Sequence, residues 1–163
     1  MMDEVFIGFA ALYLRDVLDA SQAITSMVIA IEMAGSLLSI LALGPLVKRI
    51  TPHRLLLLQA LLVLVGVSAL LSLHSIWVAM LALFITSLGG AGWYPIAKAA
   101  AYAQLLGRSG RVRAVVSLGA PFEVALPAIV GFVAGRVGVL AGVGLLGMTP
   151  VLILLLVPWR RRP

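Results

Sequence analysis

Two carboxylic acids, Glu32 and Glu123, stand in the middle of long apolar stretches of the sequence. If such a stretch crosses a membrane, a charge at its centre costs roughly 2.5–3.5 kcal/mol on insertion scales, so the side chain normally faces a cavity or a partner. Both acids are therefore candidates to bind a proton or a cation. The alternatives are a hydrogen bond from Glu32 to a neighbouring helix, with Gln59 as the candidate partner, and neutral packing of Glu123 in the protein interior.

Several other polar side chains share a helix with Glu32. At about 100° per residue, an arc of roughly 140° contains Gln22, Thr25, Ser26, Glu32, Ser36 and Ser39. One polar stripe on an otherwise apolar helix predicts the wall of a hydrated path. The segment around Glu123 carries Pro121 and Pro127. Because prolines remove helical hydrogen bonds, we expect a bent helix with an acid at its centre.

Three aromatic residues are further candidates. Trp93 and Tyr94 follow the glycine-rich residues 89–92, and they could face a solute or lie at the membrane interface, where aromatic rings are enriched. Tyr13 would line the central face if the first helix is truncated. Lys98 lies where the fourth helix should leave the membrane, so we expect its long side chain to reach towards the headgroups.

The sequence offers no constellation for catalysis or for metal binding. It has no cysteine, which excludes disulfides, thiolate metal sites and thiol nucleophiles. The two histidines, His53 and His74, stand in turns expected on opposite sides of a membrane. No His-Glu-x-x-His, Gly-x-Ser-x-Gly or phosphate-cradling motif occurs. We therefore expect neither an enzyme nor a protein with a metal or another cofactor.

The composition points to a membrane protein. Hydrophobic residues make up 63% of the 163 residues and charged residues only 11%, whereas soluble domains carry about 25% charged residues. A bilayer core of about 30 Å needs about 20 apolar helical residues. Five stretches are long enough: residues 20–47, 55–73, 76–97, 114–135 and 137–159. Their solid apolar runs lack the period of two that barrel strands show, so an all-α membrane protein with one transmembrane domain over residues 1–163 is predicted.

The first membrane segment is the short one. Its uncharged run covers only residues 5–14 before Arg15, Asp16 and Asp19 interrupt it. We therefore expect six transmembrane helices, of which the first is short or truncated.

The basic residues predict the orientation. With six crossings, ten of the 12 Lys and Arg residues fall on one face of the membrane, and only Arg15 and Arg136 fall on the other. Lys and Arg concentrate in cytoplasmic loops, so both termini are predicted to be cytoplasmic, in a chain that resides in the plasma (inner) membrane. The same asymmetry explains the basic excess without a nucleic-acid partner.

An internal similarity links the two parts of the chain. Residues 44–51 read Gly-Pro-Leu-Val-Lys-Arg-Ile-Thr and residues 131–138 read Gly-Phe-Val-Ala-Gly-Arg-Val-Gly, and each stretch follows an apolar helix with one acid. The crossing count puts the first motif on the cytoplasmic side and the second on the outer side. Two three-helix units in opposite orientations, at about 3–74 and 75–159, form an inverted repeat, which is frequent in secondary transporters.

These residues resemble the C-terminal half, helices seven to twelve, of the major facilitator superfamily. The resemblance covers nearly the whole chain and rests on residues 9–18 (Phe-Ala-Ala-Leu-Tyr-Leu-Arg-Asp-Val-Leu), on the loop after the second helix, and on residues 89–95 (Gly-Gly-Ala-Gly-Trp-Tyr-Pro). The loop is similar to the family motif Gly-x-x-x-Asp-Arg-x-Gly-x-Arg, and its matching residues are Gly44, Lys48, Arg49 and Arg54.

The loop also departs from the family motif. Lys48 stands where the family has an acid, and Thr51 replaces the second glycine. The usual charge pairing of this motif, which helps to hold the inward-closed state, therefore lacks its acid in this chain.

The resemblance implies solute transport by alternating access, with the solute between two six-helix halves. The predicted function is half of a secondary active transporter that moves a small solute, coupled to protons through Glu32 or Glu123. The expected partners are the lipid bilayer, the solute, and either a missing N-terminal half or a second copy. The alternative is a non-transporting membrane module or sensor that assembles with a partner chain.

Overall fold

The computed structural model describes the backbone of residues 2–72, 75–104 and 120–156, and of the isolated residues 110, 113 and 117. Within its helices, the side chains of residues 2–4, 101, 104, 120, 122–124, 153 and 156 lie outside the description. The regular structure in these ranges is helical. The helices are α1 (Met2–Asp16), α2 (Gln22–Val47), α3 (Pro52–Ser72), α4 (Ile76–Gly90), α5 (Trp93–Gln104), α7 (Ala120–Val137) and α8 (Val139–Leu156).

Three stretches of the described helices are long and apolar enough to cross a membrane: Gln22–Val47, Pro52–Ser72 and Ile76–Ala100. Shorter apolar helices run over Ala125–Val137 and Val139–Leu152. The expected class, an all-helical membrane protein, is confirmed to this extent. The six crossings and the internal repeat stay predictions.

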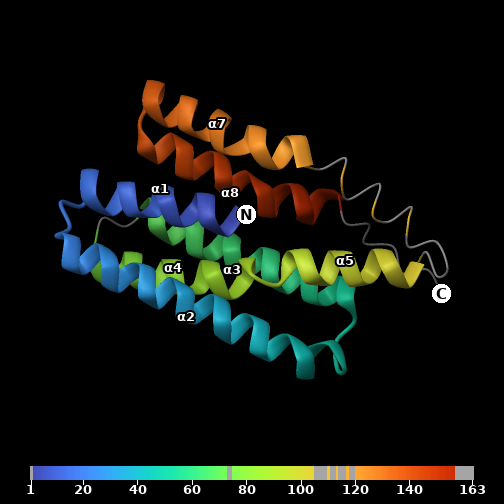
Figure 1. The fold of residues 1–163 in the computed structure, drawn as a ribbon. Helices are drawn as coiled ribbons and strands as arrows, with labels where there is room; N and C mark the ends of the chain where they lie inside the picture. The colour runs from blue at the N-terminus through green and yellow to red at the C-terminus, as the bar shows by residue number, and fades with distance from the viewer. Residues whose placement is uncertain are drawn as a thin grey trace.

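Helix α4 lies at the centre of the bundle. Both α2 and α3 pack along it, and α1 contacts α2, α4 and α8. Helix α8 packs on α3, and α7 packs on α8 as an outer layer (Figure 1). The α1–α2 and α7–α8 connections lie at one end of the bundle, whereas the α2–α3 connection and the end of α5 lie at the other (Figure 1).

The helix connections are short and follow from local sequence. The Ser21 hydroxyl accepts the Ile24 amide at 3.4 Å and so caps the start of α2. Pro52 begins α3, where its missing N–H costs nothing. Gly138 has φ of 116°, a conformation that side chains rarely adopt, and it turns the chain from α7 directly into α8.

Glycines allow α4 to approach its neighbours closely. A Cβ atom on Gly66 of α3 would lie 2.7 Å from the carbonyl oxygen of Ala82 on α4. A Cβ on Gly35 of α2 would lie 2.9 Å from the carbonyl oxygen of Phe84 on α4. Membrane helices associate through such close contacts between small residues, because burial from water contributes little between them.

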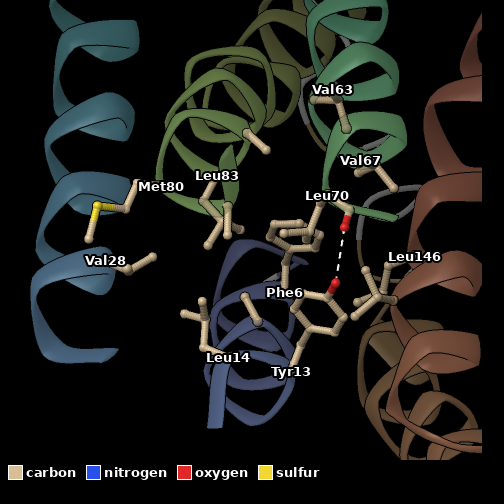
Figure 2. Packing of buried hydrophobic residues seen from close by; sticks show 14 of the residues in the cluster. Phe6, Tyr13, Leu14, Val28, Val63, Val67, Leu70, Met80, Leu83 and Leu146 are labelled. Carbon is tan, nitrogen blue, oxygen red and sulfur yellow. Dashed lines mark hydrogen bonds between the residues drawn. The ribbon is translucent and has the colours of Figure 1, made fainter. Parts of the chain in front are cut away.

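An apolar core fills the space between α1, α3, α4 and α8. It includes, with Val28 of α2, the residues Phe6, Tyr13, Leu14, Val63, Val67, Leu70, Met80, Leu83 and Leu146 (Figure 2). The Tyr13 hydroxyl donates to the Leu70 carbonyl at 3.2 Å and so joins α1 to α3 within this core (Figure 2).

Large apolar side chains also cover the outside of the bundle. Trp77 is 76% exposed and Leu155 is 72% exposed. Helix α2 alone presents an outer apolar row consisting of Met27, Met33, Leu37, Leu38, Ile40 and Leu41. Soluble proteins rarely expose apolar patches of this kind, so the surface is suited to contact with lipid.

The contact of Gly66 with α4 gives a test of this packing. Gly66→Ala would place its Cβ against the backbone of Ala82 and Thr86, so we expect the free energy of unfolding to fall by about 1–3 kcal/mol. Gly131→Ala on α7 is the matched control, because nothing lies within 4 Å of that Cβ position. Denaturation of both variants in mixed micelles measures the difference. A Gly66→Ala variant as stable as the control would contradict the arrangement.

Candidate functional site

Glu32 lies in the interior of the bundle. Its side chain is on the buried edge of α2, and the residue is only 3% exposed. It lines a small pocket between α1, α2 and α4, whose other walls are the apolar residues Ile7, Ala10, Ala11, Leu14, Val28, Ile29 and Leu83. The pocket has a volume of about 10 Å³, which is room for about one water molecule and far less than the roughly 300–1,000 Å³ of ligand sites. Glu32 is therefore suited to bind a proton rather than to enclose a whole solute.

Two serines extend from Glu32 along α2 to the end of α4. The Ser36 hydroxyl donates to Glu32 Oε1 at 3.4 Å, and the Ser39 hydroxyl donates to the carbonyl oxygen of Leu88 at 2.7 Å. Residues spaced by three and four lie on one face of a helix, so α2 presents the three side chains in a row. We call Glu32, Ser36, Ser39 and the Leu88 carbonyl the polar seam.

The polar seam ends at a break in the fourth membrane segment. The sequence predicts one helix over residues 76–97, but α4 ends at Gly90 and α5 begins at Trp93. Pro95 has no amide hydrogen, so the helical bond to the Ala91 carbonyl cannot form. The last recorded bond before the break joins the Ala91 amide to the Ser87 carbonyl at 3.3 Å, and the first after it joins Ile96 to Gly92 at 3.1 Å. The apolar span Ile76–Ala100 is retained, but it is divided in two.

Gln59 of α3 stands at this break. The residue is 4% exposed, and its carbonyl oxygen Oε1 has no hydrogen-bond partner in the part of the chain that the structure describes. A Cβ atom on Gly92 would lie 2.8 Å from Gln59 Cδ and would collide with Nε2. The absence of a side chain at Gly92 therefore makes room for the amide.

The other residues of the predicted polar stripe divide between two environments. Thr25 and Ser39 are buried and Ser36 is half-buried, whereas Gln22 and Ser26 are exposed. The predicted arc was wider than the face of α2 that meets α1 and α4. Only its buried part belongs to the polar seam or lies beside it.

The three aromatic candidates also differ in burial and in contacts. Tyr13 is fully buried, and its hydroxyl is used in the bond to Leu70, which is a packing role. Trp93 is half-buried, and its indole Nε1 lacks a partner among the described residues. Tyr94 is 57% exposed, with the Lys98 ammonium 5.3 Å from its ring centroid. This pair on the outside of α5 supports the expected interfacial position of Lys98.

The family-like loop lies at the basic end of the bundle. Gly44, Lys48, Arg49 and Arg54 are all exposed, and nothing lies within 4 Å of a Cβ on Gly44. At the opposite end, Arg15 pairs with Asp16 at 2.9 Å.

One of the sequence candidates cannot be placed. The backbone of Glu123 is part of α7, but its side chain lies outside the described residues. Nothing about a role for Glu123 is therefore added by the structure.

The bond from Ser39 to Leu88 can be tested through stability. Ser39→Ala leaves a terminal carbonyl of α4 without this donor, and interhelical hydrogen bonds in membranes contribute about 0.6–1.7 kcal/mol. We expect a loss of that size in the free energy of unfolding. Ser68→Ala on α3 is the matched control, because Ser68 is exposed. Equal stability of the two variants in mixed-micelle denaturation would argue against a contribution from this bond.

No family model, curated protein or solved structure matches this chain. The polar seam and the divided helix are therefore the observations from which a function can be proposed.

Proposed function

We propose that this chain is half of a secondary active transporter, which moves a small solute by alternating access and uses Glu32 as its proton-binding group. The observation that carries the proposal is a buried carboxylate on the same face of α2 as Ser39, whose hydroxyl donates to the end of a divided membrane helix. Acids inside a membrane typically mark ion pathways and proton relays. Secondary transporters bind solutes and coupling ions near the midplane, at discontinuous helices.

The depth of Glu32 supports this role. Glu32 follows the first residue of α2 by ten residues, or about 15 Å of helix, in an element of 26 residues. It therefore stands near the middle of a membrane span, where a bound proton is equally far from both surfaces. The neighbouring α1 contributes four of the seven apolar residues of the pocket wall, so a shift of α1 would change the access of water to the acid.

The proposed complete transporter contains two such units. In this proposal α1, α2, α3, the pair α4 and α5, α7 and α8 make the six crossings of one half-fold of the major facilitator type. The exposed basic residues Lys48, Arg49 and Arg54 would place the α2–α3 loop in the cytoplasm, with the chain in the plasma membrane. An N-terminal half or a second copy would supply the other wall of the solute path.

Uptake into proteoliposomes tests the proposal. The chain is reconstituted with an imposed pH gradient, and radiolabelled lactate, choline, glycine and glucose are supplied separately. We expect gradient-driven accumulation of one of them. Glu32→Gln should abolish accumulation but leave downhill exchange, because the solute still binds while the proton does not. Asp16→Asn is the matched control, since Asp16 is a carboxylate at the bundle end, and it should accumulate solute normally.

Two outcomes would overturn the proposal in different ways. Accumulation that is unchanged in Glu32→Gln removes Glu32 from the coupling mechanism. Absence of flux for all four solutes, both with the chain alone and with its complex with any membrane protein that copurifies with it, would instead establish the alternative of a non-transporting module or sensor.

A further inference from the structure

Three basic residues stand at the connection between α2 and α3. Lys48 and Arg49 follow the last residue of α2, Arg54 is the third residue of α3, and all three are exposed. No ion pair joins these side chains to any residue in the part of the chain that the structure describes. At the opposite end of the bundle, by contrast, Arg15 Nε lies 2.9 Å from Asp16 Oδ1. The connection between α2 and α3 therefore carries positive charge that the described residues do not neutralise.

The surrounding sequence is also free of acids. Between residues 33 and 122 it contains seven Lys and Arg residues and no Asp or Glu. The nearest acid along the chain is Glu32, which precedes Lys48 by 16 residues, or about 24 Å of helix, and lies in the interior of the bundle. An anionic group from outside the chain is therefore the natural counter-ion.

Each side of the connection continues into an exposed apolar face of its helix. Two rows of exposed residues share the same spacing of four, three and four: Leu37, Leu41, Gly44 and Lys48 on α2, and Arg54, Leu58, Leu61 and Val65 on α3. Residues with this spacing lie on one face of a helix. We call them the α2 row and the α3 row. Each row is apolar and ends in a cation at the same connection.

The length of the two rows matches one leaflet of a membrane. Each row extends over 11 residues from its cation, or about 16 Å of helix. Half of a bilayer core of about 30 Å is about 15 Å. A lipid whose headgroup contacts the cations would therefore have its acyl chains along the α2 and α3 rows.

Two cation–aromatic pairs mark the two membrane surfaces. The Lys98 ammonium lies 5.3 Å from the ring centroid of the exposed Tyr94, on α5, which ends at the same end of the bundle as the α2–α3 connection (Figure 1). The Arg136 guanidinium lies 5.1 Å from the ring centroid of the exposed Phe132, near the opposite end. Basic and aromatic side chains are typical of the headgroup level. The α2–α3 connection is therefore at a membrane surface, within reach of phosphates of the lipid.

We propose that the α2–α3 connection binds an anionic phospholipid, with Lys48, Arg49 and Arg54 contacting its phosphate and with its acyl chains along the α2 and α3 rows. A net negative charge is required, because a zwitterionic headgroup would bring its own cation to a surface that has no acid. A free phosphate or an acidic protein would match the charge but would leave the apolar rows unused. The proposal concerns a lipid and not the transported solute, so it does not depend on the proposed function.

Native mass spectrometry counts the bound lipid directly. The full chain, freed of lipid in a neutral detergent, is titrated with palmitoyl-oleoyl phosphatidylglycerol or with the corresponding phosphatidylcholine. We expect saturable binding of phosphatidylglycerol, tighter than that of phosphatidylcholine by roughly tenfold or more. Inorganic phosphate, added in equal concentration, should not displace the lipid, because it cannot contact the apolar rows.

Paired substitutions separate the α2–α3 connection from the rest of the surface. Lys48→Gln combined with Arg49→Gln should weaken phosphatidylglycerol binding by roughly 25-fold, which is about fivefold for each charge near an anionic surface. Arg15→Gln combined with Arg136→Gln is the matched control, because it removes two charges from the opposite end, and it should bind the lipid like the parent. Lys48→Arg combined with Arg49→Lys keeps the charge and should also bind like the parent.

Four results would overturn the proposal. They are equal affinity for phosphatidylglycerol and phosphatidylcholine, unchanged lipid binding after Lys48→Gln with Arg49→Gln, an equal loss in the control pair, and a loss of the same size in the charge-keeping pair. Displacement of the lipid by an equal concentration of inorganic phosphate would assign the cations to a free anion instead. The titration contains no solute, so none of these results bears on transport.

Discussion

The hydrogen bond from Ser39 to the Leu88 carbonyl is the interaction on which the interior of the bundle depends. In lipid no water is available to satisfy a backbone carbonyl, so a helix that ends within the membrane needs a donor from another helix. Helix α4 ends two residues after Leu88, and Ser39 of α2 supplies that donor at 2.7 Å. Because the bond fixes α2 against the end of α4, it also holds Glu32, two turns earlier on α2, against the pocket formed with α1.

Close packing of α4 makes this bond possible. Gly35 of α2 and Gly66 of α3 each leave room for the α4 backbone, and Gly89 of α4 lies against the Gln59 backbone of α3 in the same way. Larger side chains at these positions would separate the helices by more than a hydrogen bond can reach. The small residues and the polar seam therefore act together. The glycines let the helix backbones approach closely, and the hydrogen bonds of the seam satisfy polar groups that this packing buries.

The positions of the helices could be predicted from the sequence better than the contacts between them. Apolar runs of about 20 residues are sufficient to identify the helices, because the bilayer imposes their length. The burial of Glu32 was also predictable, since an acid in such a run must avoid lipid. The break at residues 91–92 was missed, although Pro95 and the preceding glycines carry a signal for it. Gln59 was a candidate partner of Glu32, but it lies beside Gly92 instead. Its position depends on how α3 packs on α4, which no local sequence pattern encodes.

The buried polar side chains differ in whether they form hydrogen bonds between helices, and this difference has a physical meaning. The hydroxyl groups of Tyr13 and Ser39 each donate a hydrogen bond to a backbone carbonyl of another helix, so these polar residues stabilise the fold. Gln59 makes no such bond, although its surroundings are equally apolar. A chain selected for stability alone would replace that amide, because proteins retain destabilising groups mainly where function requires them. The contrast separates the residues that hold the helices together from Gln59, whose carbonyl oxygen accepts no hydrogen bond from the described residues.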